Sequence, residues 1–324
     1  MPARVTRGRR ATHGRARGAR PRVRPRLCDD GAARGPSARE PLHLARLRRV
    51  QCGARPRGRR PVTGSEVAAV GVVTGWGRSA VALPPDAVRA AAGRRVIAVE
   101  PPRAAGERFR RATRECQLGV AAVEALLREA SLGPEAIRGD ETALVYVTAA
   151  AYGSSNRAFI RAIASSTLHF PYTAPSAVPA EVAIEFGLTG PYVILIGGAA
   201  ATIDGLWQAT LLLRRGQCRR ALVLAVETFA ECEDLWARGR WLVRPPLVES
   251  AACALVVPGP WRATYAPAPA PSPLEALARA RAGETLACAP LIALALARAA
   301  GDAGPVTLTG EWRGRRAGLA WEAH

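Results

Sequence analysis

The chain has 324 residues, of which 49% are apolar, so it can bury a substantial core in one large domain or two smaller ones. No apolar run of about 18 residues is free of charge, which argues against a membrane-spanning helix. The formal charge of +20 suggests nucleic-acid binding, but residues 1–61 carry a net +16, which leaves about +4 for residues 62–324. The charge therefore argues against a nucleic-acid-binding surface on the rest of the chain.

Residues 1–61 are rich in Arg, Gly, Pro and Ala and show almost no apolar periodicity. Such a segment cannot bury enough surface to offset its chain entropy, so we predict that it is disordered. Three interpretations stay open: a mis-assigned start that is not translated, a disordered tail, or a basic arm that binds nucleic acid or an acidic membrane. In the first case Val62 begins the protein.

Residues 62–258 form the first predicted folded region. Buried strands are predicted at residues 67–77, 142–148, 191–196, 219–228 and 249–259, and helices at 107–131, 154–164, 175–187 and 200–216. Strands with two apolar faces that alternate with helices predict an α/β fold with a mostly parallel five-stranded sheet. The helix over 200–216 lacks a clear polar face, which predicts that it lies between two layers.

Residues 259–324 have a different texture. The stretch "PGPWRATYAPAPAPSP" predicts a Pro/Ala linker. A helix over 285–301 and a β-hairpin over 306–323 are predicted to follow it. Seven cysteines with no CxxC pair favour reduced thiols in a cytoplasmic protein over a disulfide framework or a zinc site.

Several blocks together resemble β-ketoacyl synthases of the thiolase superfamily, over roughly residues 67–258. The blocks are "VAAVGVVTGWG", "AVPAEVAIEFGLTGPYVILIGGAAATIDGLWQATLLLRRGQCRRALVLAVET" and "PLVESAACALVVPG". The resemblance implies a thiolase-like layered α/β fold with a largely complete N-terminal half. It also implies that the C-terminal half is strongly reduced, which would leave the face of one layer uncovered.

In this family a nucleophilic Cys begins a buried helix, where the helix N-terminus favours the thiolate. Counted from Gly190, that position falls on Ala199. The chain has no Lys, and none of its histidines lies in the family's H-G-T-G-T segment. If "GETLACAPLIALALARAAG" corresponds to the family's G-H-T-L-G-A segment, Glu284 takes the place of the second catalytic histidine. The four histidines are His13, His43, His169 and His324.

The resemblance therefore implies a catalytically inactive subunit of the chain-length-factor type, with no cofactor or metal. Its expected partner is a full-length β-ketoacyl synthase in polyketide, aryl polyene or fatty-acid-type biosynthesis, and an acyl carrier protein would act through that partner. The strand that pairs across the family's two-fold axis is the expected interface, since an unpaired apolar edge invites aggregation. Its residues are Tyr192, Val193, Ile194, Leu195 and Ile196.

Other interpretations stay open. The chain could be an active acyltransferase or hydrolase that uses Thr202 or a cysteine outside the motif, or it could be the product of a degraded gene. Asp204 and Glu227 could be imagined as an acid pair. We expect instead that Asp204 is stabilised in the first turn of a helix and that Glu227 makes a structural hydrogen bond at a strand end.

Overall fold

The computed structural model describes residues 63–100, 112–153, 156, 159–160, 170–229, 245–302 and 304–323. The Arg-rich segment 1–61 and most of the helix predicted at 154–164 lie outside them. In chain order the elements are β1 (Ser65–Thr74), η2 (Ala80–Ala82), α1 (Ala87–Ala91), β2 (Val96–Ile97), α2 (Arg114–Glu129), η4 (Pro134–Ala136), β3 (Thr142–Thr148), η5 (Phe170–Thr173), α4 (Ala177–Phe186), β4 (Tyr192–Ile196), α5 (Ala199–Arg214), β5 (Arg220–Glu227), β6 (Leu247–Val248), β7 (Ser250–Pro258), β8 (Arg262–Pro267), α7 (Pro273–Ala282), η6 (Leu286–Cys288), α8 (Ala289–Ala299), β9 (Thr307–Trp312) and β10 (Arg315–Glu322).

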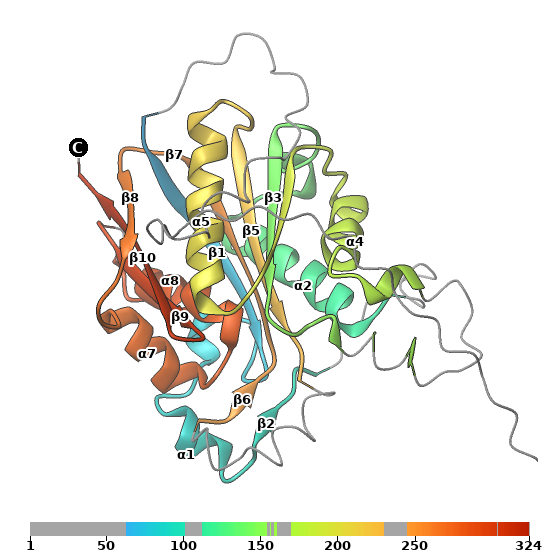
Figure 1. The fold of residues 1–324 in the computed structure, drawn as a ribbon, viewed down its shortest axis with the longest axis vertical. Helices are drawn as coiled ribbons and strands as arrows, with labels where there is room; N and C mark the ends of the chain where they lie inside the picture. The colour runs from blue at the N-terminus through green and yellow to red at the C-terminus, as the bar shows by residue number, and fades with distance from the viewer. Residues whose placement is uncertain are drawn as a thin grey trace, which may run out of the picture. The chain divides into compact units, whose positions relative to one another are not determined.

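The central feature is a five-stranded sheet with the order β1-β7-β5-β3-β4 (Figure 1). β3 pairs in parallel with β4 and β5, whereas β7 is antiparallel to both β5 and β1. Four strands therefore run in one direction and β7 runs against them. The predicted α/β fold with a mostly parallel five-stranded sheet is confirmed, and β3 has the predicted limits of 142 and 148.

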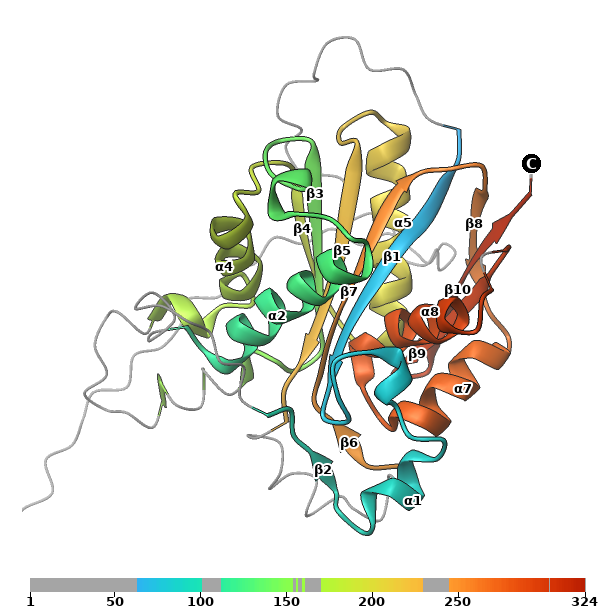
Figure 2. The same ribbon diagram turned by 180° about the vertical axis from the view of Figure 1, so that it is seen from behind.

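Helices cover both faces of this sheet, because its inner strands are apolar on both sides. α2 and α4 pack on one face (Figure 2), and α5 and α8 pack on the other. Each face has its own apolar cluster: Leu144 and Leu224 contact the first pair of helices, and Val145 and Val223 the second. The helix predicted at 107–131 begins later than expected, at Arg114, because Ala112 and the extended N-cap Thr113 are not helical; residues 107–111 lie outside the described part.

A second, antiparallel sheet with the order β8-β10-β9 covers the outer side of α5. Leu308, Leu319 and Trp321 point into the core that α5 and α8 share. The prediction that α5 lies between two layers is therefore confirmed. The expectation that one layer would be left uncovered is wrong, since the short C-terminal region supplies the missing layer as three strands.

The predicted Pro/Ala linker contains ordered elements. Its first part is β8, which pairs with β10 from Arg262 opposite Glu322 to Pro267 opposite Ala317. Its last residues begin α7, where the Ser272 hydroxyl accepts a hydrogen bond from the Glu275 N–H and Pro273 occupies the first turn. The sequence did not predict either element, because Ala carries little information on hydrophobic periodicity. The Ser-Pro-x-Glu motif, however, is a recognisable helix N-cap signal. The helix and hairpin predicted after the linker are present as α8 and as β9 with β10.

Candidate functional site

The site begins at the turn between β4 and α5. The strand ends at Ile196, and α5 begins at Ala199 after two glycines. The Gly198 carbonyl accepts the N–H of Ala201 at 2.9 Å, which closes the first turn of the helix. Such a helix start favours a negative charge or a thiolate on its first residue. Here that residue is an alanine, which has no reactive atom.

The hairpin strand β9 covers this turn. A Cβ on Gly310 would lie 2.7 Å from the Ala199 carbonyl oxygen, so only glycine allows the two backbones to approach so closely. A Cβ on Gly198 would overlap the indole of Trp312. Ala199 is accordingly 9% exposed. The chain thus closes the space beside Ala199 with its own C-terminal hairpin.

Thr202, the nearest hydroxyl along the helix, is fully buried. Its Oγ1 donates a hydrogen bond to the Ala287 carbonyl at 2.6 Å, which ties α5 to η6. All four histidines of the sequence lie outside the described residues. The described part of the chain therefore places no imidazole next to this hydroxyl as a base.

The described cysteines are all free and buried. Burial raises the pKa of the Cys116 thiol to about 12, and it also raises the pKa values of Cys253 and Cys288. Cys218 lies beyond the far end of α5. A nucleophilic thiol needs a lowered pKa and access to its substrate. The raised pKa values keep the thiols of Cys116, Cys253 and Cys288 in the neutral form, which is a poor nucleophile.

Glu227 lies fully buried at the end of β5, beside η6. Its Oε1 accepts the N–H of Ala149 at 2.6 Å and of Ala287 at 3.3 Å, and its Oε2 accepts the N–H of Ala150 at 3.0 Å. Burial raises the pKa of this carboxyl to about 8, although the three N–H donors act in the opposite direction. The expected structural hydrogen bonding at a strand end is confirmed, and it joins β3, β5 and η6.

Glu284 lies between α7 and η6. Its carboxylate accepts from the Arg279 guanidinium at 3.1 Å and from the Leu286 N–H at 3.1 Å. Its backbone N–H and carbonyl are bonded to Pro246 and Val248. These contacts position the residue and leave its assignment to the second histidine's place as a proposal.

Asp204 does not act through the helix N-terminus as expected. Its two carboxylate oxygens receive hydrogen bonds from the Arg315 guanidinium at 2.7 and 2.8 Å, and one of them also accepts from the Tyr265 hydroxyl at 2.7 Å. Burial and the Asp204 carboxylate raise the pKa of Tyr265 to about 12, so the phenol stays a donor. This contact joins α5 to β8 and β10. It needs residues from three distant segments, so no local pattern could predict it.

Glu249 is a second buried carboxylate, and no sequence pattern predicts its role. Glu249, which precedes β7, forms an ion pair with Arg114 at 2.5 Å and accepts the N–H of Val99 and of Phe229.

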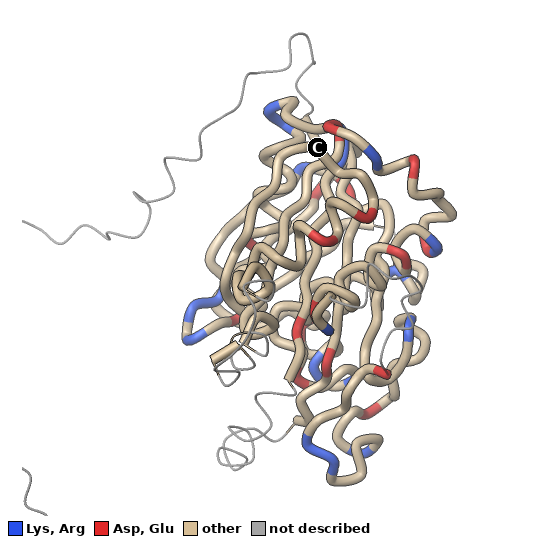
Figure 3. Tube along the Cα trace, turned by 90° about the vertical axis from the view of Figure 1, so that its right-hand side faces the viewer, with Lys and Arg blue, Asp and Glu red and all other residues tan. Residues whose placement is uncertain are grey.

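Among the described residues, no cluster of His, Cys, Asp and Glu is arranged to hold a metal ion. No helix in the same part of the chain is long and apolar enough to cross a membrane. Figure 3 shows acidic and basic residues interspersed along the described chain.

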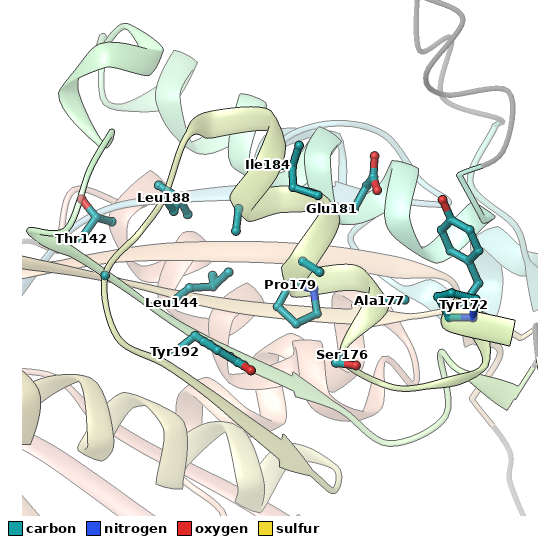
Figure 4. Close-up of a pocket in the computed structure, with 14 residues that line it drawn as sticks. Thr142, Leu144, Tyr172, Ser176, Ala177, Pro179, Glu181, Ile184, Leu188 and Tyr192 are labelled. Carbon is teal, nitrogen blue, oxygen red and sulfur yellow. The ribbon is translucent and has the colours of Figure 1, made fainter. Parts of the chain in front are cut away.

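A different kind of site lies at the other end of the sheet order. β4 is an edge strand whose second side meets no strand in the described part of the chain. Beside it, β3, η5, α4 and β4 enclose a cavity of about 500 Å³ (Figure 4), lined chiefly by apolar side chains. The expected interface strand, Tyr192–Ile196, is thus an edge strand of the described sheet, and its role as an interface stays a proposal.

Residues 101–242 match the family model for the β-ketoacyl synthase N-terminal domain. Comparison with curated protein sequences finds no match. This segment thus has the N-terminal domain of the β-ketoacyl synthase family, and the fold of the described residues is the thiolase-like ketosynthase fold.

Three solved structures show the same fold. One is described as a type II PKS acyl-carrier protein in complex with its ketosynthase bound to the hexaketide; the TM-score is 0.66 at 12% identity, over 81% of this chain and 100% of the other. The ishigamide ketosynthase/chain length factor has a TM-score of 0.61 at 16% identity, over 80% and 99%. A β-ketoacyl synthase from Burkholderia phymatum STM815 has 0.61 at 12%, over 81% and 100%. At these identities the likeness concerns the fold alone.

Proposed function

We propose that this chain is a catalytically inactive ketosynthase-like subunit of the chain-length-factor type, which pairs with an active β-ketoacyl synthase. The observation that carries the proposal is the position of Ala199. It begins the buried helix where the family's nucleophile is expected, and Gly310 of β9 packs directly against it. A thioester cannot form on an alanine, and β9 packs closely against the turn that begins the helix.

The accessible edge of β4 supports the partner role. In a parallel ladder, alternate residues direct both backbone groups to the same neighbour. The Pro191 carbonyl accepts the Leu144 N–H of β3, and the Gly197 N–H donates to the Thr148 carbonyl of β3. The odd-numbered residues therefore direct their backbone groups to β3, and the backbone groups of Ile194 point to the open side. A partner strand could bond to them and extend the sheet across the two subunits.

The neighbours described as a ketosynthase with its acyl carrier protein and as a ketosynthase/chain length factor agree with this role. These neighbours support polyketide biosynthesis as one candidate pathway, beside the alternatives of aryl polyene and fatty-acid-type biosynthesis. The acyl carrier protein would dock on the active partner, because Ala199 cannot receive its acyl group.

The test is co-expression with each full-length β-ketoacyl synthase of the same organism, followed by affinity purification. Both Ile194→Pro and Ile194→Ala remove the isoleucine side chain, but only Ile194→Pro also removes the backbone N–H that points to the open side. Only Ile194→Pro should therefore abolish co-purification. In parallel, the isolated chain is incubated with acyl carrier thioesters and its mass is measured. A stable monomer that does not bind the ketosynthase would refute the partner role. Acyl transfer to the chain would refute its inactivity.

A further inference from the structure

Large exposed apolar side chains gather around the cavity beside β4. Ile184 and Tyr192 line it, each 65% exposed, and Phe170 precedes the lining residues Pro171 and Tyr172. Ile196 at the far end of β4 is 52% exposed. Contiguous exposed apolar surface of this kind marks an interaction site more often than isolated residues do.

The sequence explains why the cavity is open. Tyr192, Ile194 and Ile196 alternate along β4 and share one face of the strand. Ile194 packs into the core under α4, whereas the two outer residues are left exposed. Ala177, Ala180 and Ile184 follow helical spacing along α4 and line the cavity (Figure 4). The two alanines are too short to fill the space between helix and strand.

The size and shape of the surface favour a protein as the occupant. A cavity of about 150 Å³ holds one benzene ring, so the volume here accommodates roughly three groups of that size. A small ligand enclosed by these walls would leave Phe170 and Ile196 exposed. A protein that also runs along β4 would cover the cavity and both residues together.

We infer that this cavity anchors the partner: apolar side chains of the ketosynthase that pairs with β4 insert between α4 and β4. The inference rests on the proposed function and specifies the chemistry of the partner's surface. A strand paired with β4 places every second side chain on the α4 face, next to Tyr192 and the mouth of the cavity. The matching surface of the partner must therefore carry large apolar residues at these positions and no charge.

The test fills the cavity from within. Ala180 is exposed in α4 and lines the cavity, and Ala280 is exposed in α7, so Ala180→Trp and Ala280→Trp are the same change at two helical sites. Affinity for the β-ketoacyl synthase that co-purifies with the parent chain is measured with full-length proteins. Ala180→Trp should weaken binding about tenfold or more, as expected for blocking a central pocket, whereas Ala280→Trp should leave it unchanged.

A second pair of variants keeps the test valid if Ala180→Trp fails to fold. Ile184→Ser trims the rim of the cavity, and Leu277→Ser trims an exposed apolar residue of α7. Only Ile184→Ser should weaken binding, with circular dichroism of both variants like that of the parent. Hydrogen exchange should also show protection of α4 when the complex forms.

The remaining outcomes separate the two proposals. If the parent chain binds the ketosynthase and both members of each pair bind equally well, the anchor is wrong and the proposed function stands. If the parent chain binds no ketosynthase, the proposed function fails and the anchor with it. A homodimer that Ala180→Trp breaks would identify a second copy as the occupant, and a co-purifying small molecule that this change displaces would identify a ligand site. Each would overturn the inference.

Discussion

At the scale of single residues, two independent features support the proposed inactivity of the turn before α5. Ala199 lacks a reactive atom, and Gly310 and Trp312 of β9 occupy the space beside the turn. The sequence reveals the first feature once the position is counted from Gly190. It gives no sign of the second, because Trp312 lies more than a hundred residues away in a hairpin that has no motif.

Restoring the thiol therefore should not restore access. We expect Ala199→Cys to react slowly with a neutral thiol reagent, even though the helix start lowers the thiol pKa. Adding Trp312→Ala should speed the reaction at least about tenfold. The reason is that the free energy needed to open the structure locally and expose the thiol falls by about 1.4 kcal/mol or more. Mass mapping of the labelled peptide separates the introduced thiol from those of the natural cysteines, and Ala280→Cys serves as an exposed reference. Equal rates in the single and double variants would show that β9 does not shield the turn.

At the scale of elements, the buried Glu227 joins three segments that the sequence keeps apart. Its carboxylate accepts backbone N–H groups that follow β3 and one from η6, while the residue itself ends β5. A glutamate at the end of an apolar strand indicates a hydrogen-bonding role. Only the packing of η6 over this strand end removes the carboxyl from water, and that burial raises its pKa.

This burial predicts a pH-dependent stability. In the unfolded chain the carboxyl ionises near its ordinary pKa of 4.5, whereas the folded chain keeps the proton up to about 8. Between these values the folded state binds a proton that the unfolded state has released, so the free energy of unfolding falls as the pH rises, by up to about 1.4 kcal/mol per pH unit. Thermal unfolding of the parent should show this slope and that of Glu227→Gln should lack it. Parallel curves for the two proteins would contradict the assignment.

At the scale of the whole molecule, two sheets enclose α5, and polar contacts join the layers at the edge of the apolar core. Arg315 of β10 and Tyr265 of β8 meet Asp204 of α5. The Arg298 guanidinium likewise donates to the Val67 and Ala68 carbonyls at the irregularity in β1. These contacts join β8, β10 and α8 to the first region.

Removing the Asp204 charge should loosen the second sheet. Because Arg315 is 56% exposed, we expect Asp204→Asn to lower the free energy of unfolding by only about 0.5–1 kcal/mol, with faster hydrogen exchange in β8 and β10. Glu141→Gln breaks a comparable exposed ion pair with Arg219 within the first region, so it should cost no more free energy of unfolding and should leave hydrogen exchange in β8 and β10 unchanged. Chemical denaturation and hydrogen exchange measure both. Unaltered exchange in β8 and β10 would show that apolar packing alone holds the sheet.

Sequence patterns alone were enough to predict the five-stranded sheet, the buried helix α5 and the alanine at its start. These follow from local apolar periodicity, glycine positions and the order of blocks along residues 67–258. The tertiary structure decided what a local pattern cannot encode. It turned a Pro/Ala-rich stretch into β8 and α7, placed β9 over Ala199, and left β4 at the edge beside a cavity. These features depend on contacts between residues far apart in the chain, whose energies come from burial and complementary shape rather than from the residues' own preferences.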